Sequence, residues 1–312
     1  EEEGCGTIVL EAGLGGAFDA TCAVSPAALD VLTSVGLDHT DLLGDTIEQI
    51  ARDKAGIITP GGRVISGALA PGARAEVEET VRERSAALHH PPEVEGIEFR
   101  EEGIRLDFRF GGGERWENVR VGMSGAHQAA NAAVAAGACR LLGLGDADIR
   151  AGLREARLPC RVERMPGEPN VILDGAHNGD KVRALMGALS TVRADRRLFV
   201  LGVVGDKNYE GIARELAGPS DRFFVTMPPG SAPRPGLPPE KFARALRQSG
   251  AVDIREFVDP WQAFEAALSE AGEGDLVVVT GSLFLAGELR KRWVSEERIV
   301  EAGHPFPPEM GR

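Results

Sequence analysis

A repeated alternation of strand and helix after Pro159 constrains the fold of this chain more than any other feature. Short apolar segments typical of strands are each followed by a helical pattern. The expected strands are 171–174, 198–204, 222–226, 254–258 and 276–280, and the expected helices are 178–190, 209–217, 239–249, 260–271 and 283–293. Such an alternation predicts an α/β fold with a parallel sheet covered by helices on both faces.

The residues before Leu158 follow a different order. The pattern predicts strands at 7–11, 30–36 and 63–67, helices at 46–55, 73–88, 127–142 and 148–157, and antiparallel hairpins within 96–121. A chain of 312 residues is long enough for two domains. We therefore predict one domain over residues 1–158 and a second over residues 159–312.

Composition excludes several classes of function. The formal charge is −13 and no long Lys/Arg run occurs, which argues against nucleic-acid binding. No apolar run approaches the ~20 residues that a membrane span needs. The four cysteines are scattered without a CxxC pair and no signal peptide is visible, which predicts a cytoplasmic protein without a disulfide framework.

Glu11 and His39 form the first candidate site. Each comes just after an expected strand, and they lie 28 residues apart, about one βαβ unit. Neighbouring parallel strands would bring both side chains to the sheet edge where α/β proteins bind ligands. A carboxylate and an imidazole there could hold a divalent cation. The pattern alone favours the plainer reading, in which both residues cap loops.

Lys54 lies in line with Ile47 and Ile50 on the apolar face of its expected helix. A cation there is costly unless it is paired or modified. Carbamylation would convert it into an anion able to support a metal. The pattern alone favours a plainer reading, in which Lys54 complements the helix dipole in the last turn and extends to water.

The run Gly13-Leu-Gly-Gly16 resembles a dinucleotide fingerprint only in part. GxGxxG would require glycine where Phe18 stands, so this motif fails. The glycines more simply allow a tight turn beside a ligand. Asp19 follows in a turn, where it could accept hydrogen bonds from a heterocycle or from its own backbone.

The second candidate site lies near the expected domain boundary. Asp174 and His177 follow a strand and open a helix, again at the ligand edge of a sheet. Arg161 has the planar fork that suits phosphates, and the amide of Asn131 could read an adenine edge. Each residue alone could be a cap or a solvated surface group. Four of them near one boundary favour a nucleotide cleft.

Several strings of this sequence together resemble the bifunctional folylpolyglutamate synthase/dihydrofolate synthase family, a branch of the Mur ligases. They are Glu-Ala-Gly-Leu-Gly-Gly-Ala-Phe-Asp-Ala-Thr (11–21), Gly-Leu-Asp-His-Thr (36–40), Leu-Gly-Asp-Thr-Ile (43–47), Asp-Lys-Ala-Gly-Ile-Ile (53–58), Gly-Ala-His-Gln-Ala-Ala-Asn (125–131) and Leu-Asp-Gly-Ala-His-Asn (173–178), with later echoes at 205–207 and 280–283. The likeness runs from residue 7 to about residue 293. It implies a Mur-ligase-like α/β architecture: a truncated central P-loop-type domain, then a Rossmann-like C-terminal ligase domain.

The resemblance also implies an activity. Such an enzyme uses ATP and Mg²⁺ to join L-glutamate to a carboxylate of a folate or dihydropteroate through an acyl phosphate, and it is usually a monomer. The implied roles are magnesium ligands for Glu11 and His39, a carbamylated lysine for Lys54, a pterin-side contact for Asp19, and ATP contacts for Asn131, Arg161 and Asp174 with His177 nearby. With the resemblance, carbamylation replaces the plainer reading of Lys54.

The sequence departs from the family pattern in three ways that affect the expected activity. No Gly-Lys pair occurs anywhere, so the GxxxxGK[ST] phosphate loop is missing. Cys22 stands where the family usually has Asn, and Cys160 where it usually has Gly. We expect a ligase that lacks its first segment, with little activity as this fragment. The alternatives are a non-catalytic truncated nucleotide-binding or interaction protein, and a Mur-type ligase with another acceptor.

Overall fold

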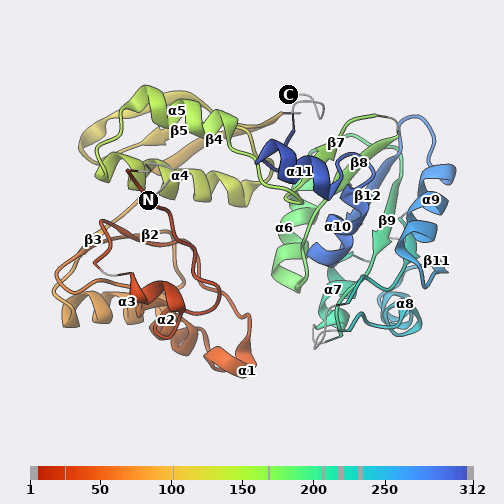
Figure 1. Ribbon diagram of the computed structural model, residues 1–312, viewed down its shortest axis with the longest axis horizontal. Helices are drawn as coiled ribbons and strands as arrows, with labels where there is room; N and C mark the ends of the chain where they lie inside the picture. The colour runs from red at the N-terminus through yellow and green to blue at the C-terminus, as the bar shows by residue number, and fades with distance from the viewer. Residues whose placement is uncertain are drawn as a thin grey trace. The chain divides into compact units, whose positions relative to one another are not determined.

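The computed structural model describes residues 6–24, 26–100, 102–167, 169–205, 208–216, 221–230 and 235–307. The chain divides into two compact units (Figure 1). Unit 1 comprises residues 1–98, 105–121 and 127–155, and unit 2 comprises residues 99–104, 122–126 and 156–312. Among the described residues, no helix is both long and apolar enough to cross a membrane.

Unit 1 is built on a small parallel sheet in the order β1-β2-β3. Its strands are β1 (Asp30–Leu32), β2 (Arg63–Ser66) and β3 (Ala87–His89), and its main helices are α2 (Ile47–Ala55), α3 (Pro71–Glu83), α4 (Ala126–Leu141) and α5 (Asp146–Glu155). Neighbouring residues of β2 bury opposite faces: Val64 packs in the cluster with α2 and α3, and Ile65 packs against Val134 of α4.

Helix α2 begins and ends where its sequence predicts. The Thr46 hydroxyl accepts a hydrogen bond from the Gln49 amide, and the Gln49 side chain accepts from the Thr46 amide, which completes a capping box. Ile50 is fully buried, while Lys54 in the last turn is half-buried. The helix therefore fixes the position of Lys54 through its cap and its buried face.

Three predictions in unit 1 are wrong. Residues 7–11 form no strand, and Ile8 and Val9 are 73% and 92% exposed. The expected strand 30–36 ends at Leu32, because its partner β2 ends at Ser66. The expected helix 73–88 runs over Pro71–Glu83, since Ser85 adopts a φ of 52° and the following residues pair with β2 as β3.

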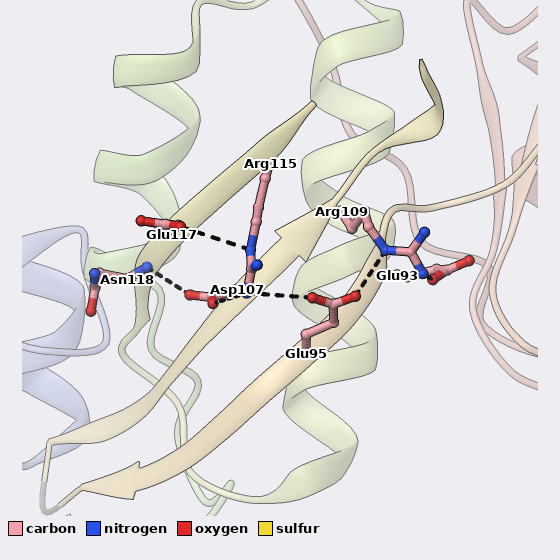
Figure 2. Close-up of polar contacts among 7 residues, drawn as sticks. All are labelled: Glu93, Glu95, Asp107, Arg109, Arg115, Glu117 and Asn118. Atoms are coloured by element: carbon pink, nitrogen blue, oxygen red, sulfur yellow. Dashed lines mark hydrogen bonds and ion pairs between the residues drawn. The ribbon is translucent and has the colours of Figure 1, made fainter. Parts of the chain in front are cut away.

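A second sheet, most of which belongs to unit 1, presents a charged face and an apolar face, as its period-two pattern predicts. It contains β4 (Glu93–Arg100), β5 (Gly103–Arg109) and β6 (Arg115–Val121), with the 3₁₀ turn η2 (Gly111–Gly113) between β5 and β6. On the charged face, Arg115 contacts Asp107 at 2.8 Å and Glu95 at 3.5 Å, and Arg109 contacts Glu95 at 2.8 Å (Figure 2). These ion pairs are exposed, so they add little stability. The opposite face buries Leu106, Phe108 and Trp116.

Unit 2 contains the predicted α/β sheet, in the order β11-β10-β9-β12-β8-β7. All neighbouring strands are parallel except β7 with β8. Its strands are β7 (Glu163–Met165), β8 (Asn170–Leu173), β9 (Arg197–Leu201), β10 (Arg222–Val225), β11 (Asp253–Glu256) and β12 (Leu276–Thr280). The last strand, β12, lies between β8 and β9, so the order of the strands reverses there. Ligands bind at such a switch point, outside the carboxyl ends of the strands.

Helices cover both faces of this sheet. Those on one face are α6 (Gly179–Leu189), α7 (Tyr209–Leu216) and α8 (Pro239–Gln248), and those on the other are α9 (Pro260–Glu270) and α10 (Leu283–Arg290). The sequence pattern missed β7 and the final helix α11 (Glu296–Ala302). β7 has only three residues, and no residue of α11 is buried, so neither offers a clear apolar period.

Candidate functional site

Asp174 is the buried acid at the carboxyl edge of the unit 2 sheet. It follows β8 and is 7% exposed. Its Oδ2 accepts a hydrogen bond from the Val162 amide at 2.9 Å, and its Oδ1 accepts from the Ala176 amide at 2.8 Å. Burial raises the pKa of Asp174, and the two amides and the Arg161 guanidinium oppose that rise. The carboxylate therefore fixes the backbone on both sides of itself.

Arg161 and His177 lie beside this acid. A Cβ added to Gly175 would meet Arg161 Nη1 at 2.7 Å, so the guanidinium lies against the Gly175 backbone. His177 Nδ1 donates to the Gly175 carbonyl oxygen at 2.8 Å, and Lys181 Nζ lies 2.9 Å from His177 Nε2. The structure therefore brings together three residues that the sequence analysis selected: Arg161, Asp174 and His177.

Thr280 belongs to the string 280–283, which resembles the family. It ends β12 at the switch point and is fully buried, and its Oγ1 has no hydrogen-bond partner among the described residues. An unpaired buried hydroxyl is costly to stability. Gly281, which follows, donates its amide to Ala176 O at 3.0 Å, so this strand end lies beside the Asp174 loop.

The glycine loop of unit 1 is organised by Asp19. Its Oδ2 accepts from the amides of Gly13 at 2.9 Å and Leu14 at 3.1 Å, and its Oδ1 accepts from the Thr21 amide at 2.9 Å and hydroxyl at 2.7 Å. The hydrogen bonds from Thr21 are the main reason that the pKa of Asp19 falls to about 2. Asp19 also caps the 3₁₀ helix η1 (Ala20–Ala23). These bonds support the turn reading of Asp19, and its carboxylate is already engaged by its own loop.

The same loop lies on the helix end that carries Lys54. Gly16 donates its amide to Asp53 Oδ1 at 2.8 Å, and the Ala17 amide donates to Asp53 O at 2.9 Å. A Cβ on Gly16 would meet Lys54 O at 2.6 Å, so only glycine fits there without displacement. Asp53 was not selected from the sequence, although it stands next to Lys54.

His39 and Glu11 are less constrained in this structure. His39 has a φ of 52° at the start of helix α1 (Thr40–Leu43), with Nε2 3.9 Å from Asp38 Oδ1. Because β1 ends at Leu32, His39 does not directly follow a strand, and neither does Glu11. The strand-end argument that paired them is therefore wrong. Among the described residues, no three His, Cys, Asp or Glu side chains form a metal-sized cluster. A site of two protein ligands is a smaller group and stays a prediction.

Asn131 lies on the exposed side of α4. Its Nδ2 donates to Gln128 Oε1 at 3.0 Å, and Gln128 itself is buried with Nε2 3.2 Å from His127 Nε2. The Asn131 carbonyl oxygen has no partner among the described residues. This leaves one acceptor that could bond the amino group of a base.

Comparison with known proteins explains why these motifs occur in one chain. Residues 160–283 match the family model "Mur ligase, glutamate ligase domain". The dihydrofolate synthase/folylpolyglutamate synthase of Bacillus subtilis is 32% identical over 296 residues, which cover 91% of this chain and 67% of that protein. This chain therefore belongs to the folylpolyglutamate synthase/dihydrofolate synthase family. The predicted resemblance and α/β fold class are confirmed.

Other members show how much of a family protein this chain covers. A probable bifunctional folylpolyglutamate synthase/dihydropteroate synthase of Halobacterium salinarum is 35% identical over 97% of this chain, which spans only 38% of that protein. The Mycobacterium tuberculosis folylpolyglutamate synthase complexed with ADP superposes with a TM-score of 0.81 at 28% identity, covering 90% of this chain and 66% of that one. Escherichia coli FolC in complex with DHPP and ADP gives a TM-score of 0.76 at 30% identity, covering 90% and 64%.

Proposed function

We propose that this protein acts as an ATP-dependent ligase that adds L-glutamate to a carboxylate of a folate or dihydropteroate and forms ADP. The observation that carries the proposal is the grouping of Arg161, buried Asp174 and His177 at the carboxyl edge of a sheet that matches the glutamate ligase domain. The relatives named above support the same reaction class. The family also supports a cytoplasmic, monomeric protein.

In the first step, an oxygen of the folate or pteroate carboxylate attacks the γ-phosphorus of ATP. The bond from that phosphorus to the β,γ-bridging oxygen breaks, which releases ADP and leaves an acyl phosphate. The planar guanidinium of Arg161 suits phosphate oxygens, and the amide of Asn131 suits the adenine edge. Catalysis at this step is mainly positioning and neutralisation of charge.

In the second step, the unprotonated amine of glutamate attacks the acyl carbon and inorganic phosphate leaves, carrying one oxygen from the original carboxylate. The nitrogen then loses a proton to give the amide. Holding the acyl phosphate and the amine together turns a bimolecular step into a nearly unimolecular one.

Magnesium is the cofactor that this proposal requires. When bound, it neutralises phosphate charge. The exposed carboxylate of Glu11 and the imidazole of His39, whose side chain is 29% exposed, have donor atoms suited to a divalent cation, and water and phosphate oxygens would complete the shell. We further propose that Lys54 is carbamylated, as in the family, and that the glycine loop against its helix end orders it.

The experiment that tests the proposal is a coupled product assay. The longest reading frame that contains this chain is expressed, and the protein is incubated with ATP, Mg²⁺, labelled glutamate and either dihydropteroate or tetrahydrofolate. We expect one ADP for each glutamate incorporated, detected by mass spectrometry of the folate product. Turnover only with a peptidoglycan precursor would show that the acceptor is not a folate. Nucleotide binding without any ligation would favour the non-catalytic alternative.

A further inference from the structure

The segment that carries Arg161 has an unusual backbone. Cys160 and Val162, on either side of Arg161, have φ angles of 54° and 49°. Residues with a side chain rarely adopt this left-handed conformation, and for a β-branched residue such as Val162 it is a clear outlier. Two such residues flanking one arginine persist only where the surroundings hold them in place.

Three hydrogen bonds hold this segment. Asp174 Oδ2 accepts from the Val162 amide at 2.9 Å, and the Gly175 amide donates to Cys160 O at 2.9 Å. The third bond comes from outside the Asp174 loop: the Cys160 amide donates to Glu163 Oε2 at 2.8 Å. The Glu163 carboxylate therefore fixes the residue immediately before Arg161.

Glu163 is itself held by a buried partner far away in the sequence. Arg290 Nε lies 3.0 Å from Glu163 Oε1 and 2.9 Å from Oε2, and the side chains of Glu163 and Arg290 are 8% and 5% exposed. Arg290 Nη2 also donates to Pro305 O at 2.7 Å, and its guanidinium lies 5.2 Å from the ring centre of Phe306. A buried ion pair often contributes no net stability compared with apolar residues, so stability alone does not account for it.

We propose that Glu163 is a positioning residue for the nucleotide site: anchored by Arg290, it holds the Cys160 amide and thereby aims the Arg161 guanidinium along the Gly175 backbone. This inference rests on the proposed function, in which Arg161 contacts the phosphates of ATP. It adds Glu163 as a residue that acts on ATP through Arg161 without touching it. Loss of the hydrogen bond from the Cys160 amide to Glu163 should therefore weaken nucleotide binding more than it weakens glutamate binding.

The test compares two double variants that both remove the buried charges. Glu163→Gln/Arg290→Met keeps a carbonyl oxygen that can accept from the Cys160 amide, and Glu163→Met/Arg290→Met does not. Neither leaves an unpaired buried ion, so both are expected to fold. The readouts are the KM for ATP, the KM for glutamate and the calorimetric dissociation constant for ADP. We expect the Gln variant to stay within about twofold of the parent, and the Met variant to lose about tenfold in ATP and ADP affinity with an almost unchanged KM for glutamate.

A matched control uses the ion pair of Arg197 and Asp221, whose side chains are 3.0 Å apart. The Asp221 side chain is 2% exposed, and this pair does not contact the Arg161 segment. Arg197→Met/Asp221→Asn should leave ADP affinity unchanged. Equal ADP affinity in the two Glu163 variants, or an equal loss in the control, would overturn the inference.

Arg161→Ala separates the two proposals. If it leaves ADP and ATP affinity unchanged, the proposed role of Arg161 fails; if it weakens them while Glu163→Met/Arg290→Met does not, only this inference fails.

Discussion

The carboxylate of Asp53 accepts a hydrogen bond from the amide of Gly16 at 2.8 Å, which ties the glycine loop to helix α2, whose last turn carries Lys54. The Asp53 carbonyl oxygen accepts a second bond from the Ala17 amide at 2.9 Å. The loop and the end of α2 therefore form one structural element. Residues that the sequence presents as a turn and as a helix terminus are joined by these two hydrogen bonds.

Replacing Gly16 by alanine should break this contact. The new Cβ would meet Lys54 O at 2.6 Å and Asp53 O at 2.8 Å, and backbone atoms cannot move aside as a flexible side chain can. We expect a loss of about 1–3 kcal/mol in the free energy of unfolding, measured in urea. Gly36→Ala is the matched control, because a Cβ there meets nothing within 4 Å and should change stability by less than about 0.5 kcal/mol. Equal stability of the two variants would show that the loop does not pack on α2 in solution.

Asp19 should make the stability of the protein depend on acidity. Its pKa falls from an ordinary value of 3.8 to about 2 in the folded chain, chiefly because Thr21 donates to the carboxylate. Between these values the unfolded chain binds more protons, so the stabilisation is present above pH 3.8 and is lost as the pH falls toward 2. Asp19→Asn should remove this part of the acid dependence. A carbon-detected NMR titration that gives Asp19 an ordinary pKa would contradict the hydrogen-bond pattern.

Cys160 should tolerate glycine better than valine. At a φ of 54°, a side chain costs about 1–2 kcal/mol that glycine does not pay, while glycine loses the packing of a buried thiol. We expect Cys160→Gly to lie within about 1 kcal/mol of the parent in urea unfolding, and Cys160→Val to be less stable because β-branching is poorly tolerated at this φ. The opposite order would argue against the left-handed backbone.

Thr280→Val should stabilise the protein. The Thr280 hydroxyl is buried without a partner among the described residues, so replacing it by a methyl group of the same shape should raise the free energy of unfolding by about 1 kcal/mol. Thr280→Ser, which keeps the unpaired hydroxyl, is the control and should not gain this stability. A valine variant that is less stable than the parent in urea unfolding would contradict the unpaired hydroxyl.

The sequence predicted unit 2 well because four of its five parallel strands, β8, β9, β10 and β12, are largely buried, and its helices from α6 to α10 each bury one face against the sheet. The five parallel strands and the helices between them begin and end within a few residues of the expected positions. The grouping of Asp174 with His177 follows from the same pattern, since a short loop after β8 keeps them at one sheet edge. The contact with Arg161 depends on the left-handed backbone at Cys160 and Val162. Cysteine and valine rarely adopt this conformation, so their presence in the sequence does not predict it.

Unit 1 was harder to predict because its contacts join distant segments. The apolar run at residues 7–11 has the composition of a strand, but a strand also needs hydrogen-bonded neighbours, and Val9 is 92% exposed. The pattern gave no signal for Asp53, whose role depends on a loop 37 residues away. Glu163 was likewise missed, because its partner Arg290 is 127 residues distant.

The central claim, glutamate ligation through an acyl phosphate, is tested most directly by isotope transfer. The protein is incubated with ATP, Mg²⁺, glutamate and a folate or pteroate whose reacting carboxylate carries ¹⁸O at both oxygens. Because the attacking carboxylate oxygen leaves with the phosphate, we expect one ¹⁸O in each inorganic phosphate released, by mass spectrometry. Formation of the glutamyl amide with unlabelled phosphate would contradict the account.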